Sequence, residues 1–416
     1  MRYPRLLIFS LFVLFAISGK AAPDEAALGK AAGYPAARSL KQAYQEPYLV
    51  GSFSAMDSFN PSCSLPPADK PVPLKKAANG TKFHYRFAGR PALTLDDYMQ
   101  HQRATGLLVV KDGEIVAERY NYARTAEMRM LSNSMAKTIT ALGIVKALED
   151  GLIGSLDDRA ETYVPELKGT LFGQTRIVNL MRMASGARYV EDYSGQDDRA
   201  RFNDTARRLG IVEAARSVTE RSDPEGERFN YAGAQTEVLG LVLRGATGRT
   251  LCDYIDEKIW KPVGAEAEAT WLLNPADKVE LAQGAFNATL RDYARLGMMM
   301  ANDGQVRGVT VVSHEHLLAM TDAGKQPEAF RPGHMQYHGS TYFGYGFQTW
   351  ILPGTHHRRF MLMGVYGQAI FVDPQLRLVI VHTAVGKDAS GDASGNHLGA
   401  ERDALVRGIV STYGEW

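Results

Sequence analysis

The sequence contains few cysteines, almost no excess charge of either sign and only one long hydrophobic run. Cysteine occurs at just two of the 416 positions, Cys63 and Cys252, which excludes a disulfide-rich scaffold. The 47 basic and 46 acidic side chains leave a formal net charge of +1, and no Lys/Arg block is interleaved with aromatic residues. Nucleic acid and anionic membranes are therefore disfavoured as partners. The sequence has no internal repeat, and we expect neither a metal nor a cofactor.

The one hydrophobic run lies at the N-terminus. A short basic segment, residues 1–5, precedes an apolar stretch over 6–17, and small residues at Gly19 and Ala21 suit a cleavage site before Ala22. The stretch is too short to span a bilayer comfortably. We interpret 1–21 as a signal peptide and expect a periplasmic or secreted protein without stable membrane insertion. The alternative is an uncleaved N-terminal anchor.

The two cysteines could pair in the oxidising compartment that a signal peptide implies. Cys63 lies in a Pro/Ser-rich stretch, whereas Cys252 falls in a pattern typical of an amphipathic helix. Nothing in the sequence places the two residues close together, as a disulfide requires. The pattern leaves both states open, and we favour two unpaired thiols.

The distribution of periodic segments predicts an N-terminal extension followed by one large domain. Residues 22–80 are rich in Pro, Ala and Ser and show little periodicity, whereas 81–416 carry clear patterns. A β-hairpin with an Asp112-Gly113 turn is expected over 107–120. Strands at both ends of the domain with helices between them predict an α+β fold, with an antiparallel sheet built from both chain ends and a mostly helical lobe. The other expected strands are 345–352, 359–364, 368–372 and 376–382, and the helices are 134–150, 177–186, 211–216, 235–247, 251–260, 290–301 and 399–413; the polar stretch 189–203 shows no pattern.

The first candidate for chemistry is the pair Ser134 and Lys137, the only Ser-x-x-Lys match in the chain. The apolar run that follows has helical spacing, and Ser132 or Asn133 is a natural N-cap for it. On a helix, residues three apart share a face, so the hydroxyl and the amine point the same way. A serine beside an amine at a helix N-terminus is an arrangement typical of an activated nucleophile.

Two further segments follow in the order that such a site needs. Tyr231 lies in a loop that leads into a helix, where a nearby cation could lower its pKa enough for it to act as a base. Residues 364–368 open a strand with small residues, which would let a substrate lie along the strand edge. A backbone N–H at the start of that strand could join the N–H of Ser134 as an oxyanion hole.

These segments together resemble the serine β-lactamase-related hydrolases, especially the branch that contains 6-aminohexanoate-dimer (nylon-oligomer) hydrolase and related esterases. The resemblance covers about residues 85 to 410. The segments that carry it are Ser134-Met-Ala-Lys137, Met183-Ala-Ser-Gly186, Glu191-Asp-Tyr193, Phe229-Asn-Tyr231, Thr236-Glu-Val-Leu-Gly240, 286–297 and Gly364-Val-Tyr-Gly-Gln368.

The resemblance implies a β-lactamase/transpeptidase-like fold and a two-step acyl transfer. Ser134 would attack a carbonyl while Lys137 and Tyr231 accept and relay its proton, and the backbone N–H groups of Ser134 and Gln368 would hold the oxyanion. Tyr193 matches a tyrosine that lies on a mobile loop over the substrate in the nylon-oligomer branch. Substrate-binding positions would also include Tyr366 and Gly367.

The sequence departs from the family pattern at two places. The Asn expected two residues after Tyr231 is absent, although Asn230 or Gln235 could compensate. The Lys-Thr-Gly motif of true β-lactamases is replaced by 365–367, which lack a cation for a penicillin carboxylate. The leading hypothesis is an exported serine hydrolase of small esters or amides. A cell-wall D,D-peptidase or β-lactamase is the second, and a catalytically silent protein that binds peptidoglycan or a partner is the third; the sequence does not indicate the oligomeric state.

Overall fold

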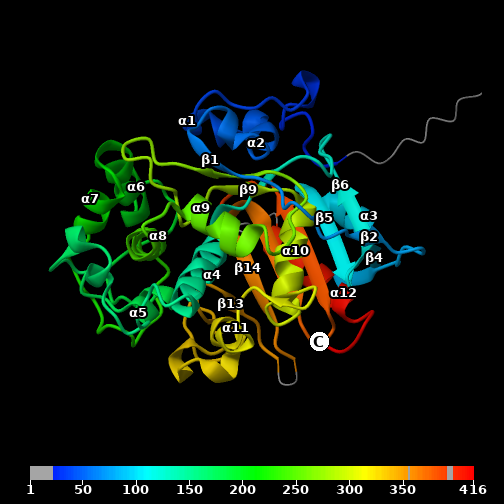
Figure 1. Ribbon diagram of the computed structural model, residues 1–416. Helices are drawn as coiled ribbons and strands as arrows, with labels where there is room; N and C mark the ends of the chain where they lie inside the picture. The colour runs from blue at the N-terminus through cyan, green and yellow to red at the C-terminus, as the bar shows by residue number, and fades with distance from the viewer. Residues whose placement is uncertain (1–21, 355–356, 391–396) are drawn as a thin grey trace, which may run out of the picture.

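An eight-stranded sheet joins the two ends of the large domain predicted over 81–416, as expected, and adds one short strand from the preceding segment. The computed structural model describes residues 22–354, 357–390 and 397–416 (Figure 1). All neighbouring strands in the sheet run antiparallel except β2 and β6. The strand order is β12 (Gly344–Tyr345), β13 (Trp350–Ile351), β14 (Phe360–Gly364), β15 (Gln368–Asp373), β16 (Leu378–Ala384), β5 (Ala104–Lys111), β6 (Glu114–Tyr120) and β2 (Lys75–Lys76).

Helices cover both faces of this sheet. On strand β5, Leu108 and Val110 pack into the core that contains helix α10 (Leu290–Ala301), whereas Leu107 and Val109 pack into the core of helix α12 (Leu398–Val410). The alternation follows from the two-residue period of a strand. Because both faces are covered, β5 is a continuous apolar run and not an alternating one.

The mostly helical lobe is also present, beside the sheet (Figure 1). Its helices pack around α8 (Gly233–Thr247), which contacts α4 (Ala136–Glu149) and every other helix of the lobe. The lobe consists of α4, α5 (Ile177–Met181), α6 (Asp198–Leu209), α7 (Ile211–Arg216), α8 (Gly233–Thr247) and α9 (Leu251–Ile255), with a π-helical turn over Asp256–Trp260.

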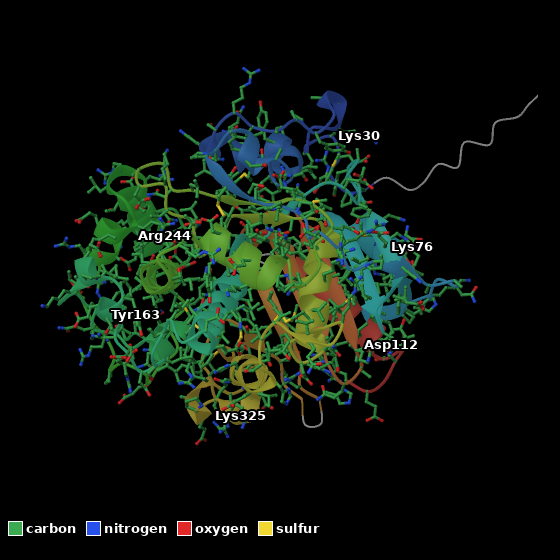
Figure 2. All side chains as sticks on the ribbon, in the orientation of Figure 1. Lys30, Lys76, Asp112, Tyr163, Arg244 and Lys325 are labelled. Atoms are coloured by element: carbon green, nitrogen blue, oxygen red, sulfur yellow. A yellow bond between two sulfur atoms is a disulfide. The ribbon has the colours of Figure 1, made fainter. Side chains whose placement is uncertain are left out.

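Residues 22–80 are folded and lie against the large domain over 81–416. Their apolar side chains form a separate core that includes Tyr122, Leu131 and Leu272 of the larger region. Figure 2 shows this segment, marked by Lys30, on the opposite side of the molecule from Lys325. Its elements are α1 (Leu40–Ala43), α2 (Glu46–Ser52), β1 (Ser62–Leu65) and short 3-10 helices at Lys30–Ala32 and Met56–Ser58.

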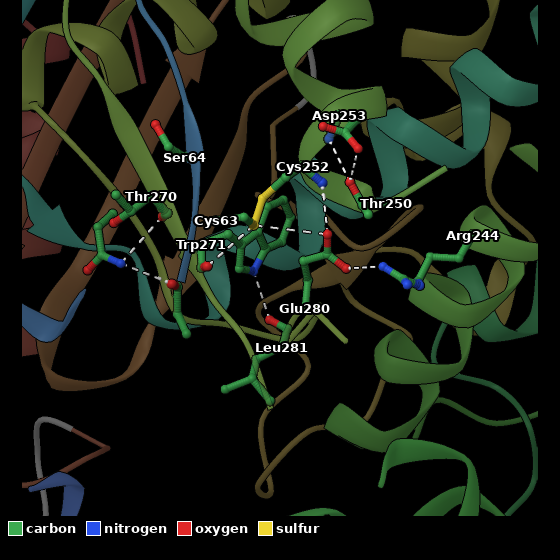
Figure 3. The surroundings of a disulfide bond; sticks show 12 residues. Cys63, Ser64, Arg244, Thr250, Cys252, Asp253, Thr270, Trp271, Glu280 and Leu281 are labelled. Atoms are coloured by element: carbon green, nitrogen blue, oxygen red, sulfur yellow. Dashed lines mark hydrogen bonds and ion pairs between the residues drawn. A yellow bond between two sulfur atoms is a disulfide. The ribbon is translucent and has the colours of Figure 1, made fainter. Parts of the chain in front are cut away.

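A second sheet contains the disulfide bond of the protein. Cys63 on β1 is bonded to Cys252 on α9, with their Cα atoms 6.4 Å apart (Figure 3). The expectation of two unpaired thiols is therefore wrong, because the chain between the two cysteines, which are 189 positions apart, folds so that β1 lies beside α9. The strand order of this sheet is β1, β8 (Ala269–Leu272), β9 (Phe286–Ala288) and β7 (Met130–Leu131).

Two local predictions are also wrong. The stretch expected as unpatterned contains the first half of α6, which Asp197 begins by accepting a hydrogen bond from the N–H of Ala200. The strand expected over 345–352 is interrupted between β12 and β13, where Gln348 adopts a positive φ of 52°. The Gln348 amide donates hydrogen bonds to the carbonyls of Leu180 and Met181, which fixes the interruption.

The remaining elements lie at the edges. Among the described residues, no helix is both long enough and apolar enough to cross a membrane. These elements are the hairpin of β3 (His84–Phe87) and β4 (Arg90–Thr94), the hairpin of β10 (Gln305–Val306) and β11 (Val309–Thr310), α3 (Leu95–His101), α11 (His314–Thr321), and 3-10 helices at Ala160–Thr162, Pro165–Leu167, Ala323–Lys325 and Glu328–Phe330.

Candidate active site

Ser134 lies in a 3-10 turn, Asn133–Met135, that leads directly into α4. The predicted N-cap is wrong, because neither Ser132 nor Asn133 makes a side-chain cap hydrogen bond. Asn133, with a positive φ of 45°, donates instead from its amide to the carbonyl of Val365 at 3.0 Å. The turn between β14 and β15 packs closely here: a Cβ on Gly364 would lie 2.4 Å from the carbonyl oxygen of Ser132. This contact fixes the segment that carries Ser134.

Lys137 is buried directly beside Ser134. Its Nζ donates hydrogen bonds to Ser134 Oγ at 3.2 Å and to the carbonyl of Gln283 at 2.8 Å, and the residue is 2% exposed. Burial lowers the pKa of Lys137 to about 8, and the negative charges of Glu191 and Glu237 act in the opposite direction. About a tenth of the amine is therefore neutral at pH 7 and can accept a proton, far more than for an ordinary lysine.

Tyr231 completes the predicted group of three. Its ring centroid lies 5.2 Å from Lys137 Nζ, and its ring stacks on Trp350 at a centroid distance of 5.7 Å. Burial raises the pKa of Tyr231 well above its ordinary value, and a hydrogen bond with Ser134 opposes that rise. The expectation that a nearby cation lowers this pKa is therefore wrong. The structure thus brings Ser134, Lys137 and Tyr231 together, and we refer to these three residues as the reaction centre.

Gln368, Tyr366 and Gly367 lie where the strand edge was predicted. Strands β14 and β15 both contact the Asn133–Met135 turn, which places the start of β15 beside the Ser134 segment. The Gln368 side chain points away into the sheet, where its Nε2 donates to the carbonyl of Ala384 at 2.7 Å. Only the backbone of Gln368 is therefore available for an oxyanion hole.

Tyr193 lies on a strained loop near the reaction centre. It has a positive φ of 62°, and the Asp197 carboxylate holds the loop by accepting the backbone N–H of Tyr193 at 2.8 Å. The Tyr193 hydroxyl donates to Glu191 at 3.0 Å. The electrostatic influence of Tyr193 contributes to the raised pKa of Tyr231, so the two tyrosines lie near each other.

Two buried carboxylates near Lys137 were missed as site residues. Glu191 accepts the backbone N–H of Gly233 at 2.7 Å, at the start of the helix that follows Tyr231. Glu237 on α8 accepts the backbone N–H groups of Ala282 and Gln283, and burial raises its pKa to about 7. Glu237 thereby positions the Ala282–Gln283 peptide, whose Gln283 carbonyl binds Lys137. Both carboxylates lie within motifs that carried the family resemblance, but their roles require the tertiary contacts.

The residues expected to replace the absent Asn do not do so. The Asn230 amide donates to the carbonyls of Ala187 and Tyr189, and the Gln235 side chain binds the N–H of Ser185 and the carbonyl of Asn230. These side chains bind backbone groups of other segments and make no hydrogen bond with Ser134 among the described residues. Gly233 occupies the position of the absent Asn, and its backbone N–H donates to Glu191.

One group of potential metal ligands occurs within the described ranges, formed by Cys63, Cys252 and Glu280. Both sulfur atoms are in the disulfide, so neither is a free thiolate ligand. Glu280 is already paired with Arg244 at 2.7 Å and accepts the N–H of Cys252 (Figure 3). This group therefore serves as a structural junction.

Comparison with known proteins places the chain in a family. The family model described as Beta-lactamase matches residues 92–403. The chain belongs to the beta-lactamase family. It is 24% identical to the 6-aminohexanoate-dimer hydrolase of Paenarthrobacter ureafaciens over 362 residues, covering 85% of this chain and 88% of the relative. The family and this relative confirm the resemblance seen in the sequence, and they indicate a hydrolase.

Solved structures agree on the fold. A Bacillus anthracis protein assigned to the 6-aminohexanoate-dimer hydrolases superposes with a TM-score of 0.75 at 25% identity, covering 89% of this chain and 98% of that one. A family VIII carboxylesterase superposes with a TM-score of 0.55 at 17% identity, covering 74% and 92%. The α+β fold predicted from the sequence is confirmed.

Proposed function

We propose that the protein is an exported serine hydrolase that cleaves small ester or amide bonds through an acyl-enzyme on Ser134. The observation that carries the proposal is the buried Lys137 amine, whose pKa is lowered to about 8 by burial and which is hydrogen-bonded to the Ser134 hydroxyl. A surface lysine would remain protonated at neutral pH and could not accept a proton. A partly neutral amine at this position is suited to activating a serine.

The proposed reaction proceeds in two halves. Ser134 Oγ forms a bond to the substrate carbonyl carbon while its proton passes to the neutral Lys137 amine, with Tyr231 as the relay. The carbonyl oxygen becomes an oxyanion that the backbone N–H groups of Ser134 and Gln368 stabilise. The proton then moves to the leaving oxygen or nitrogen as its bond to carbon breaks. Water repeats the sequence on the acyl-enzyme and releases the acid.

Two considerations favour ester or amide hydrolysis over the alternatives. Residues 365–367 supply no cation for a penicillin carboxylate, which disfavours a β-lactamase or D,D-peptidase. The three residues needed for acyl transfer are close together, which disfavours a silent binding protein. The relative is named for a 6-aminohexanoate dimer, which supports including amides among the candidate substrates.

The direct test compares 4-nitrophenyl butyrate with benzylpenicillin. We expect the wild type to hydrolyse the ester and to turn over penicillin poorly, while S134A hydrolyses neither above background. Efficient penicillin hydrolysis without esterase activity would favour the β-lactamase alternative. Activity on neither substrate, with no trapped acyl-enzyme, would favour the silent protein.

Export is part of the same proposal. It rests on the N-terminal segment 1–21, which lies outside the described residues, and it is supported by the Cys63–Cys252 disulfide, since disulfides persist mainly in oxidising compartments. Protein recovered from a bacterial periplasm or culture medium should begin at or near Ala22. An intact Met1 in a soluble cytoplasmic fraction would refute export without affecting the proposed chemistry.

A further inference from the structure

Arg199, the second residue of α6, presents a charged group beside the reaction centre that has few partners. Its Nε lies 3.8 Å from a Glu191 oxygen, which is longer than a hydrogen bond, and its Cζ lies 4.8 Å from the centroid of the Tyr193 ring. Within residues 22–354, 357–390 and 397–416, its guanidinium makes no hydrogen bond, and its side chain is 32% exposed. Its five N–H donors are therefore available.

Other arginines of this protein with little exposure are paired at hydrogen-bonding distance. Arg103 contacts Asp24 at 2.8 Å and Glu46 at 2.7 Å, and Arg359 contacts Asp373 at 2.8 Å. Each of those arginines is held in place by an ion pair, although Nη1 of Arg103 is buried without a hydrogen-bond partner. Arg199 differs because its ion-pair partner, Glu191, lies beyond hydrogen-bonding distance.

Two tyrosines complete the surroundings of Arg199. The rings of Tyr44 and Tyr366 lie 5.6 Å apart, and Tyr44 as a whole is 39% exposed. Desolvation of each hydroxyl raises its pKa, and the positive charge of Arg199 opposes that rise. Neither hydroxyl has a hydrogen-bond partner among the residues that the structure describes. Tyr366 directly follows Val365, whose carbonyl binds Asn133, the neighbour of Ser134. The cluster thus adjoins the nucleophile, and we name Tyr44, Arg199 and Tyr366 the outer cluster.

Glu191 orients Arg199 without occupying its donors. One Glu191 oxygen accepts the Gly233 N–H at 2.7 Å, and the other accepts the Tyr193 hydroxyl at 3.0 Å. The carboxylate is therefore satisfied by these two donors, while its charge keeps the guanidinium close. A planar guanidinium with free donors is the group that binds carboxylates in a bidentate manner, and tyrosine hydroxyls can donate further hydrogen bonds.

We propose that the outer cluster binds a carboxylate group of the substrate, so that the preferred substrates are esters or amides that also carry a free carboxylate. This inference rests on the proposed hydrolase function and adds the class of substrate. The carboxylate can come from either side of the scissile bond, either on the acyl chain or on the leaving group. The experiment distinguishes these two sources.

Two matched pairs of esters test the proposal. The acyl-side pair is mono-4-nitrophenyl glutarate against 4-nitrophenyl butyrate, and the leaving-group pair is 4-butyryloxybenzoate against its methyl ester. For each pair, the ratio of kcat/KM for the charged ester to that for the neutral ester is measured in the wild type, R199Q and R199K. The matched control is R207Q on the same helix, because Arg207 contacts only Asp204 at 3.7 Å and is 49% exposed.

We expect R199Q to lower the charged-to-neutral ratio about 10-fold for one of the two pairs, the size of effect typical of losing a charged hydrogen bond. R199K keeps the positive charge but loses the planar pair of donors, so its charged-to-neutral ratio should lie between those of R199Q and the wild type. R207Q should leave both ratios unchanged. Equal ratios in wild type and R199Q for both pairs would overturn the proposal while leaving the hydrolase function intact.

A failure of the hydrolase function remains distinguishable. If the wild type cleaves none of the four esters, the proposed function fails, and calorimetric titration with glutarate and with benzoate then tests the outer cluster alone. Binding to the wild type that R199Q weakens about 10-fold would support the carboxylate site. No binding to the wild type, or equal binding to both proteins, would overturn it. Unchanged circular dichroism and Tm of R199Q would exclude misfolding as the cause.

Discussion

Lys137 and Arg199 are the two cations of the candidate site, and they differ in exposure, in hydrogen bonding and in the direction of their pKa shifts. Lys137 is 2% exposed and donates two hydrogen bonds, whereas the Arg199 side chain is 32% exposed and has no hydrogen bond among the described residues. Burial lowers the pKa of Lys137 to about 8. Burial also acts to lower the pKa of Arg199, but the electrostatic effects of Glu191, Tyr193, Tyr44 and Asp197 together outweigh it, and the pKa is raised. The enclosed cation is thereby suited to proton transfer, and the open one stays charged and can bind an anion.

The two regions also differ in how the chain builds them. The reaction centre lies at the N-termini of helices α4 and α8, and the turn between β14 and β15 packs against it. The outer cluster takes Tyr44 from the N-terminal segment, Arg199 from α6 and Tyr366 from the β14–β15 turn. Changes to the first region should therefore affect kcat, and changes to the second should affect the choice of substrate.

The largest effect is expected from substitutions in the reaction centre. K137A and Y231F should each lower kcat on 4-nitrophenyl butyrate by about 10² or more, the range of general acid–base catalysis. Because both residues handle one proton, the double variant should be little worse than the worse single variant. K146A, on the same helix and paired with Asp150 at 3.0 Å, is the control and should retain activity. Near wild-type activity in K137A would show that the pair is an accident of helix composition.

A smaller effect on activity, but a clear one on stability, is expected from removal of the disulfide. Cys63 lies on β1 of the segment that also provides Tyr44, and its bond to Cys252 ties that segment to α9. C63S/C252S should lower the free energy of unfolding by about 2–5 kcal/mol. The charged-to-neutral substrate ratio should change more than kcat on the neutral ester. Denaturant unfolding measures the stability, and the same ester pairs measure the activity. Equal relative losses in the substrate ratio and in kcat on the neutral ester would contradict the separate roles of the two regions.

The smallest effect is expected from Glu237. Wild-type kcat/KM should rise with pH through about 8 as Lys137 becomes neutral. The charges acting on Lys137 are Glu191, Glu237 and Arg199. Ionised Glu237 raises the pKa of Lys137, so E237Q should move the rise in activity to lower pH. We expect a shift of less than about one pH unit, because Glu237 contributes less to this pKa than burial and Glu191 do. A uniform loss of kcat with no movement of the profile would indicate that Glu237 only holds backbone.

The raised pKa of Glu237 also predicts how the free energy of unfolding depends on pH. Its pKa is raised from 4.5 to about 7 in the folded protein, so its contribution to stability is fully present below about 4.5 and is lost as the pH rises through 7. The free energy of unfolding of E237Q should therefore depend less on pH between these values than that of the wild type. Urea titrations at pH 4.5 and 8 measure the difference, and parallel pH dependence in the two proteins would contradict the raised pKa.

The reaction centre was predictable from the sequence because its order along the chain follows local rules. Ser134 and Lys137 share a helix face at a spacing of three, and the hairpin over 107–120 has an Asp-Gly turn. The strands at the two chain ends pair through β5 and β16, as the α+β pattern required. These features depend on periodicity and spacing, which a single sequence contains.

Apart from Tyr366, the outer cluster was not predictable from the sequence, and neither were the roles of the buried carboxylates, for a physical reason. Helix α6 is rich in charged residues and buries only Phe202 and Ala206, so its sequence lacks an apolar stripe; the capping residue Asp197 was the available signal. Glu237 occupies a position where a helical pattern predicts only orientation, and its partners Ala282 and Gln283 are 45 and 46 residues away. Contacts of this kind, like the Cys63–Cys252 bond, depend on tertiary structure.

The central claim is that Ser134 is a nucleophile activated by the buried Lys137, and covalent labelling tests it most directly. The wild type is incubated with a fluorophosphonate probe, and the modified peptide and the labelling rate are determined by mass spectrometry. The account predicts a single adduct on Ser134, formed about 10² or more times more slowly in K137A and absent in S134A. An adduct on another residue, or labelling of K137A at the wild-type rate, would contradict it.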